Sequence, residues 1–447
     1  MSTFERARVL PGDVHATLAR HMLVDGYPLV VDLERSRGSW IRDARTGRDY
    51  LDFFSFFASN PIGMNHPGML EPDVQQRLLH AATVKVSNSD KYTTYMAELV
   101  DTLARTAAPP HLPHYFFIDG GALAVENALK AAFDWKVRKN LAAGRGERGH
   151  AVLHLEGAFH GRSGYTMSLT NTDPNKTAYF PKFDWPRIPA PAIAFPLEGK
   201  NLADVEERER AAIAAAENAF ARDPHGIAAI IVEPIQGEGG DNHFRPSFFR
   251  ELRRLADEHE ALLVYDEIQT GLGLTGKWWA YEHHGVEPDI LCFAKKMQIG
   301  GILVSRRIDE VSENVFAKSG RINSTWGGSL VDMVRCTRIL EIIVDEGLLE
   351  NARDRGRELL GELERIAATF SGVENARGAG LMCAVDLPDR ATRDAVLRAC
   401  FDEDMIALAC GARSMRFRPP LTIDAELVAL GARRFENALR RAGVKGA

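Results

Sequence analysis

Apolar strand patterns alternate with amphipathic helix patterns through the first two thirds of the chain. Residues 114–139 indicate a strand, a glycine turn and a helix, and further strand patterns cover 151–161 and 227–240. A helix pattern followed by a strand covers 248–271, and a short apolar strand covers 289–294. Strands that alternate with helices are typical of a largely parallel sheet with helices on both faces. The pattern therefore predicts an α/β fold.

The pattern changes at both ends of the chain. Residues 39–54, "SWIRDARTGRDYLDFF", alternate like a β-hairpin with Thr-Gly at the turn. Residues 330–370 are strongly helical, and short strand patterns such as "GAGLMCAVDL" follow between helices. The C-terminal part therefore resembles a separate α+β domain that begins near 330–340.

Composition narrows the class of protein. The 447 residues are too many for one compact core, and 45% hydrophobic with 26% charged residues is ordinary for a globular protein. A net charge of −6 without a Lys/Arg-rich tract argues against nucleic-acid binding. Five scattered cysteines fit a reducing compartment, and neither a signal peptide nor an apolar run of about 18 residues is visible. We expect a cytoplasmic enzyme with no membrane segment.

Polar residues follow five of the predicted strands. They are Gly120–Gly121, His160 with Arg162, Glu233, Asp266 and Lys295. In open parallel sheets, ligands bind beyond the carboxyl ends of the strands. The sequence therefore predicts a binding site where these strand ends meet.

Lys295 and Asp266 suggest the chemistry of that site. A pair of lysines at the end of a strand is more often a surface feature, and an aspartate there is as often a helix cap. A lysine beside an acid on the neighbouring strand, however, suits pyridoxal phosphate. The lysine attaches this cofactor covalently, and the acid keeps its ring nitrogen protonated.

Other residues could hold the rest of that cofactor. The turn at Gly120–Gly121 opens a helix, so the free amides of Gly121 and Ala122 could bind a phosphate. Phe159 could form a flat apolar wall for the ring. Taken alone, a Gly-Gly turn more often only ends a strand, and a phenylalanine more often packs in a core.

Together these segments resemble the class III pyridoxal-phosphate-dependent aminotransferases. The resemblance covers nearly the whole chain and rests on motifs in family order: "GGALAVENALK", "GAFHGRSGYT", "EPIQGEGG", "DEIQTG", "PDILCFAKK", "NSTWGG", "RGAGL" and "RFRPPL". It implies fold type I, with a mainly parallel seven-stranded sheet in a large domain and a smaller α+β domain formed by the chain ends. The implied divisions are 1–70 and 336–447 for the small domain and 71–335 for the large one.

The resemblance also implies roles for single residues. Counting along the strand from Pro288 selects Lys295 as the catalytic lysine that carries the cofactor, whereas counting back from the glycine pair would select Lys296. Lys296 is then expected to be a plain surface charge. The implied cofactor-binding residues are Gly121, Ala122, Phe159, His160, Asp266, Ile268, Gln269, Lys295 and, from the other subunit of a homodimer, Thr325. No metal ligands are implied.

Substrate binding is expected to rest on Arg162, Arg416, Glu238 and Asn323. Arginine binds carboxylates with a two-pronged fork. By resemblance, Arg416 receives the α-carboxylate of glutamate or 2-oxoglutarate, and Glu238 pairs with Arg416 while the other substrate is bound. Arg162 then holds the single carboxylate of a diamino acid, so that its distal amine reaches the cofactor.

The expected reaction transfers the ε-amino group of L-lysine to 2-oxoglutarate. The products are 2-aminoadipate 6-semialdehyde, which cyclises to piperideine-6-carboxylate, and L-glutamate. Ornithine and 4-aminobutyrate remain alternative donors. A racemase, mutase or decarboxylase on the same scaffold is also possible, as is a non-catalytic cofactor-binding protein, because a fold does not fix a reaction.

Overall fold

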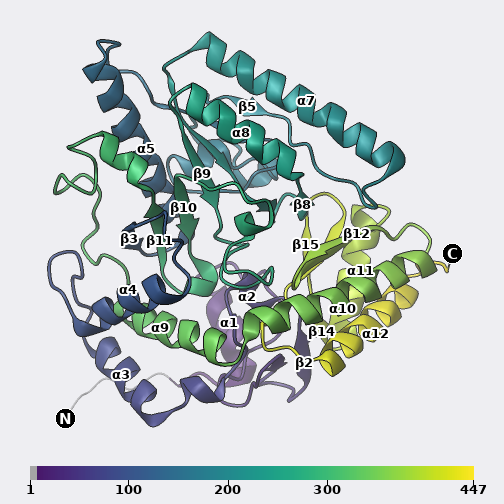
Figure 1. Ribbon diagram of the computed structural model, residues 1–447. Helices are drawn as coiled ribbons and strands as arrows, with labels where there is room; N and C mark the ends of the chain where they lie inside the picture. The colour runs from purple at the N-terminus through teal and green to yellow at the C-terminus, as the bar shows by residue number, and fades with distance from the viewer. Residues whose placement is uncertain (1–7, 447) are drawn as a thin grey trace.

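A seven-stranded sheet forms the centre of the computed structural model, which describes residues 8–446 (Figure 1). Only β11 is antiparallel to its neighbours, so the sheet is mainly parallel, as predicted. The strand order is β3 (His114–Ile118), β11 (Gly300–Val304), β10 (Ile290–Phe293), β9 (Leu262–Asp266), β6 (Ile227–Val232), β4 (Ala151–Leu155) and β5 (Arg187–Ile188).

Helices cover both faces of this sheet because its central strands are apolar on both sides. All residues of β6 and β9 are buried. Alternate residues such as Ala229 and Ile231 pack with α5 (Gly121–Ala142), whereas Ile230 and Val232 face α8 (Pro246–Glu258). A strand turns successive side chains to opposite faces, so α5 and α8 lie on opposite sides of the sheet (Figure 1).

Two smaller sheets bring the chain ends together. The predicted hairpin forms β1 (Trp40–Arg42) and β2 (Asp49–Asp52), and β2 pairs with β14 (Met405–Ile406). The other sheet has the order β12 (Glu374–Ala379), β13 (Met382–Asp386), β16 (Ser414–Phe417) and β15 (Leu408–Cys410). Helices α10 (Leu348–Thr369) and α12 (Ala425–Arg441) pack beside them. The expected boundary at 335/336 lies within α9 (Leu330–Asp345), and the division into domains stays a prediction.

Two local features differ from the simplest interpretation of the sequence. The helical stretch 330–370 is divided into α9 and α10 at Gly347, which has a φ of +62°. The glycine pair after Lys296 begins strand β11. A Cβ atom at Gly301 would lie 2.3 Å from the carbonyl oxygen of Phe116, so only glycine allows β11 to approach β3 this closely.

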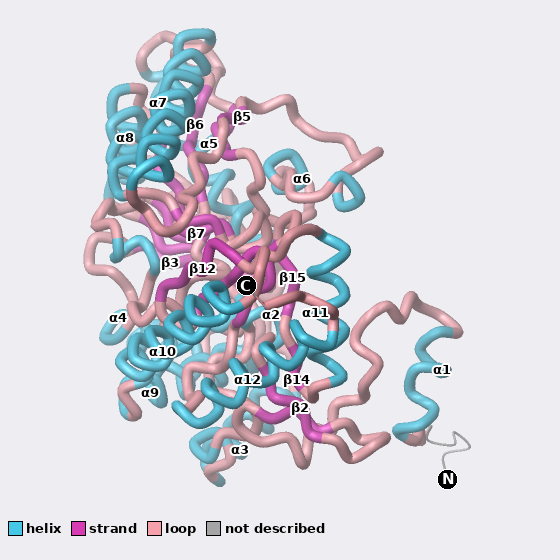
Figure 2. The backbone as a smooth tube through the Cα atoms, turned by 90° about the vertical axis from the view of Figure 1, so that its right-hand side faces the viewer, coloured by secondary structure: helices cyan, strands magenta, loops and turns pink. Residues whose placement is uncertain are grey.

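The remaining elements are short or peripheral. They are α1 (Val14–Ala19), α2 (Ser55–Ala58), α3 (Pro72–Thr83), α4 (Thr94–Thr106), α6 (Thr166–Leu169), α7 (Gly199–Arg222), α11 (Arg390–Asp402), β7 (Ile235–Gln236) and β8 (Asn242–His243). The tube view shows α1 set apart from the body of the molecule (Figure 2). Among residues 8–446, no helix is both long and apolar enough to cross a membrane.

Candidate active site

A cavity of about 540 Å³ lies at the carboxyl ends of the strands. It is bounded by the segments that follow β3, β4, β6, β9 and β10, as the polar strand ends predicted. The structure brings nine of the predicted site residues into its wall: Gly121, Ala122, Phe159, His160, Arg162, Asp266, Ile268, Gln269 and Lys295.

Lys295 and Lys296 have different surroundings. Lys295 lines the cavity. Lys296 is 2% exposed, and its Nζ donates to the carbonyl oxygens of Ala58 at 3.2 Å and Gln269 at 2.7 Å. The expectation that Lys296 is a surface charge is therefore wrong, because a short turn after β10 directs it inward to unpaired carbonyls. This geometry leaves Lys295 as the lysine available to a ligand.

The environment of Lys295 destabilises the charged form of its amine. Burial, followed by the positive charge of Arg416, lowers the pKa of Lys295 to about 8, although Asp266 opposes the shift. The backbone of Lys295 has a φ of +48°, which is uncommon for a residue with a side chain. Unusual backbone conformations of this kind persist where the surrounding structure fixes them, often at functional sites.

Asp266 presents a buried carboxylate to the cavity. It is 4% exposed, and its Oδ2 lies 2.8 Å from Nδ1 of His160, while the amide of Ile268 donates to Oδ1 at 3.1 Å. Nε2 of His160 is buried and has no hydrogen-bond partner among the described residues. A buried carboxylate in a cavity wall favours a ligand with a cationic or protonated group, such as a ring nitrogen.

The start of α5 forms an anion cradle at the same cavity. Gly120 has a φ of +88°, and the first bond of the helix runs from the amide of Ala124 to the carbonyl oxygen of Gly120. The preceding amides of 121–123 are therefore free, at the positive end of a 22-residue helix. A Cβ atom at Gly121 would lie 3.0 Å from Cδ1 of Ile268, so glycine keeps this space open.

Glu233 holds two of the loops around the cavity. Its Oε1 accepts from the amide of Phe159 and its Oε2 from the amide of Gly237, each at 3.0 Å. Burial raises the pKa of Glu233 to about 7. This residue therefore fixes the backbone beneath Phe159 and at the start of the loop that carries Glu238.

Arg416 and Glu238 form an ion pair beside the cavity. Nη2 of Arg416 lies 2.8 Å from Oε2 of Glu238, and Nη1 donates to Oε1 of Gln269 at 3.1 Å. Arg416 is only 3% exposed and does not line the cavity, whereas its partner Gln269 does. Burial alone would raise the pKa of Glu238, but Arg416 and then Lys176 hold it below its usual value.

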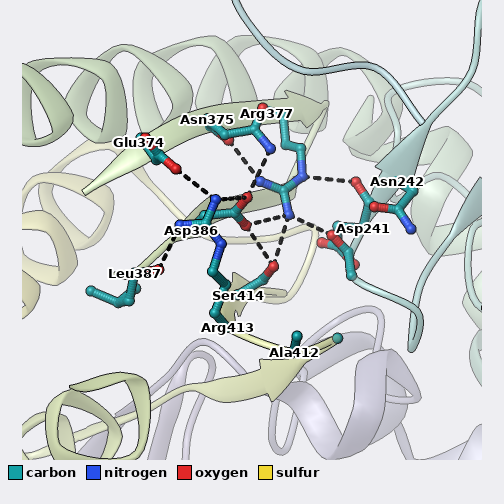
Figure 3. A network of polar contacts seen from close by, with 12 residues as sticks. Asp241, Asn242, Glu374, Asn375, Arg377, Asp386, Leu387, Ala412, Arg413 and Ser414 are labelled. Carbon is teal, nitrogen blue, oxygen red and sulfur yellow. Dashed lines mark hydrogen bonds and ion pairs between the residues drawn. The ribbon is translucent and has the colours of Figure 1, made fainter. Parts of the chain in front are cut away.

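The loop after Glu238 is fixed to the C-terminal sheet (Figure 3). Arg377 on β12 donates to the carbonyl oxygens of Gly240 and Asp241, and pairs with Asp386 on β13 at 2.8 Å. Ser414 on β16 joins the same network. The network therefore ties the backbone beside Glu238 to the strand that carries Arg416.

Three predicted residues have more exposed positions. Arg162 is exposed at the rim of the cavity. Asn323 and Thr325 are exposed and lie outside the wall of the cavity, in a loop whose Thr325 carbonyl oxygen accepts from Oγ of Ser87 at 2.6 Å. Within one chain, Asn323 and Thr325 therefore do not meet the other site residues.

Other cavity residues had no clear signal in the sequence. Ser59, Gln298, Asp332 and Arg335 also line the wall. Asp332 and Arg335 are an ordinary helical pair at i,i+3, and only the packing of α9 brings them here. The described residues contain no cluster of three or more metal-ligating side chains.

Comparisons with known proteins show the family of the whole chain. The family model for class-III aminotransferases matches residues 22–439. An L-lysine-epsilon aminotransferase from Amycolatopsis lactamdurans is 56% identical over 414 residues, which cover 92% of each chain. Its counterpart from Mycobacterium tuberculosis is 54% identical over 417 residues, 93% of this chain and 92% of that one. A mitochondrial 4-aminobutyrate aminotransferase from Rattus norvegicus is 31% identical, over 87% of this chain and 80% of its own.

A solved structure extends the likeness to the fold. The lysine aminotransferase from M. tuberculosis in the internal aldimine form superposes with a TM-score of 0.95 at 52% identity. The match covers 97% of this chain and all of that one. This chain therefore belongs to the class-III aminotransferases.

Proposed function

We propose that the protein transfers the ε-amino group of L-lysine to 2-oxoglutarate, giving 2-aminoadipate 6-semialdehyde and L-glutamate. The observation that carries this proposal is that Lys295 and Asp266 face one cavity while Glu238 neutralises Arg416 beside it. The close relatives named as L-lysine-epsilon aminotransferases support the choice of amine donor.

The cofactor is pyridoxal 5'-phosphate, and the residues present fit it. The amides at the start of α5 suit its phosphate, and the Asp266 carboxylate suits its ring nitrogen. Phe159 and Ile268 provide apolar surface in the same cavity, and Lys295 provides the amine. When bound, the cofactor supplies an electrophilic carbon and a ring that accepts electrons.

Lys295 acts as the acid–base group in our proposal. Its free Nζ would accept a proton from the ε-carbon of lysine and hold it as an ammonium group until the proton is returned. A pKa near 8 makes the neutral amine, which this step requires, far more accessible near neutral pH than it is for an ordinary lysine. Asp266 keeps the proton on the ring nitrogen throughout, because releasing it would leave an uncompensated buried carboxylate.

Arg162, Arg416 and Glu238 select the two substrates. Arg162 binds the carboxylate of lysine from the rim, and Glu238 meanwhile keeps Arg416 paired beside the aliphatic chain. For 2-oxoglutarate, Glu238 leaves Arg416, which then binds the α-carboxylate in a two-pronged fork. Asn323 is proposed to contribute to substrate binding from the exposed loop.

We expect excess L-lysine to discharge the cofactor of the loaded enzyme in the absence of a keto acid. The test follows the cofactor absorption after mixing and traps the cyclised semialdehyde with a reagent specific for that product. Loss of absorption together with the trapped cyclic product supports ε-transfer. Loss only with ornithine or 4-aminobutyrate would move the donor to one of these, because one methylene contributes only about 1–3 kcal/mol of discrimination. A spectrum that no amine changes would contradict the proposal.

We further propose a homodimer in which Thr325 of one chain completes the cofactor site of its partner. The exposed position of Thr325 and of its neighbour Trp326, which is 47% exposed, supports this arrangement, as does Tyr92 at 82%. Light scattering is expected to give twice the chain mass of 49.5 kDa, and Thr325→Ala is expected to weaken cofactor binding. A monomer with full activity would contradict the shared site.

The protein is also proposed to be cytoplasmic. Its five cysteines are all buried and free, which suits a reducing compartment.

A further inference from the structure

Glu238 lies between two cations from distant parts of the chain. Its Oε2 contacts Arg416 on β16, and its Oε1 lies 2.5 Å from Nζ of Lys176. Lys176 ends a short 3₁₀ turn (Pro174–Lys176) in the long connection between β4 and β5. Its Nζ also lies 5.4 Å from the ring centroid of Phe159, which lines the cavity. Lys176 therefore stands at the edge of the site and contacts the residue that neutralises Arg416.

The backbone around Glu238 is held in place. The amide of Gly411 donates to the carbonyl oxygen of Glu238 at 2.9 Å, and Arg377 holds the next turn of the loop through Gly240 and Asp241. A movement of the Glu238 carboxylate away from Arg416 is therefore a side-chain rotation. Lys176 has a flexible four-carbon stem and a side chain that is 26% exposed, so its ammonium group can follow the carboxylate.

The two substrates differ in the number of carboxylates that lie near Arg416. With Glu238 on Arg416, one carboxylate stands between two cations. When a dicarboxylate substrate occupies Arg416, two carboxylates share this region, and Arg416 alone cannot neutralise both. Partly buried like charges without a counterion repel each other strongly.

We propose that Lys176 is a specificity-determining residue that retains Glu238 when the carboxylate of 2-oxoglutarate or glutamate displaces it from Arg416. This inference rests on the switch role of Glu238 in the proposed function. Lys176 acts through Glu238 and selectively favours the dicarboxylate half of the reaction. The lysine half has Glu238 on Arg416 already, so it depends less on Lys176.

The test compares the two substrates on Lys176→Met in the cofactor-loaded enzyme. We expect the apparent dissociation constant for 2-oxoglutarate, taken from the concentration dependence of its single-turnover reaction with the amine form of the enzyme, to rise about fivefold while the limiting rate stays nearly unchanged. The apparent affinity for L-lysine in the single-turnover reaction is expected to change less than about twofold. Lys176→Arg should bind 2-oxoglutarate about as tightly as the wild type, because arginine keeps the positive charge. Lys200→Met, on the exposed start of α7, is the matched control for losing a lysine.

A double-mutant comparison tests whether Lys176 acts on 2-oxoglutarate binding through Glu238. In the Glu238→Gln background, Lys176→Met should no longer change 2-oxoglutarate binding, because the partner charge is gone. An undiminished effect there would mean that Lys176 contacts the dicarboxylate itself and would overturn the proposal. Equal losses for both substrates, no loss, or tighter 2-oxoglutarate binding would also overturn it. Failure of the lysine reaction alone would contradict the proposed donor and leave this binding test valid.

Discussion

Lys295→Ala is expected to abolish transamination while leaving the fold intact. Removing the amine eliminates both the covalent attachment and the group that moves the proton, so we expect the single-turnover rate with L-lysine to fall by at least about 10⁴-fold. The fold should survive because Lys295 lies at a cavity wall and its side chain fills no core. Glutamate formation from lysine and 2-oxoglutarate measures turnover, and the unfolding midpoint measures the fold.

Lys296→Met is the matched control, because it removes the adjacent lysine. This change leaves the carbonyl oxygens of Ala58 and Gln269 without their buried donor, which costs about 1–3 kcal/mol of stability. The cofactor absorption and its discharge by lysine should nevertheless persist in the folded enzyme. The opposite result, with Lys295→Ala active and Lys296→Met inert, would reverse the assignment of the catalytic lysine.

The sequence was sufficient to predict where the site lies. Glu233 follows the apolar strand β6, Asp266 ends the apolar strand β9, and parallel strands bring such ends to one edge of a sheet. The alternation of strands and helices therefore predicted that Glu233, Asp266 and Lys295 meet at one site, and all three line the same cavity. The chemistry of that cavity could be predicted only from the combination of residue types, because each residue alone had an ordinary structural interpretation.

Contacts between distant segments were not predictable in this way. The burial of Lys296 depends on carbonyl groups of Ala58 and Gln269, which become available only through tertiary packing. The residues of α2 have φ values between +41° and +61° without containing a glycine, and nothing in "SFFA" signals this turn. Lys176 likewise looks like an ordinary surface lysine until the fold places it against Glu238.

The positions of Asn323 and Thr325 could not be predicted from the sequence for a different reason. Their motif suggested a contact with the cofactor or substrate, yet their loop packs on Ser87 and Asn88 outside the cavity of its own chain. Sequence similarity transfers the residue type, whereas the position of such a loop relative to a second subunit is a property of the assembly. These two roles therefore depend on the proposed dimer.

Asp266→Asn is expected to slow the half-reaction with L-lysine by about 10²–10³-fold, with a smaller loss of cofactor affinity. The substitution keeps the shape of the side chain but removes the charge that holds a proton on the ring nitrogen. The ring then accepts electrons poorly as the proton leaves the ε-carbon. The single-turnover rate measures the chemical step, and titration of the apoenzyme measures cofactor binding.

Asp289→Asn separates this chemical effect from a loss of stability. Asp289 is also a buried carboxylate, but it precedes β10 and binds Arg253 at the opposite end of the strand from Lys295. Asp289→Asn should therefore lower the unfolding midpoint and leave the half-reaction of the folded enzyme unchanged. A cofactor analogue methylated at the ring nitrogen carries a permanent charge, so it should recover part of the rate in Asp266→Asn. Equal rates in Asp266→Asn and the wild type would show that Asp266 is not the group that keeps the ring nitrogen protonated.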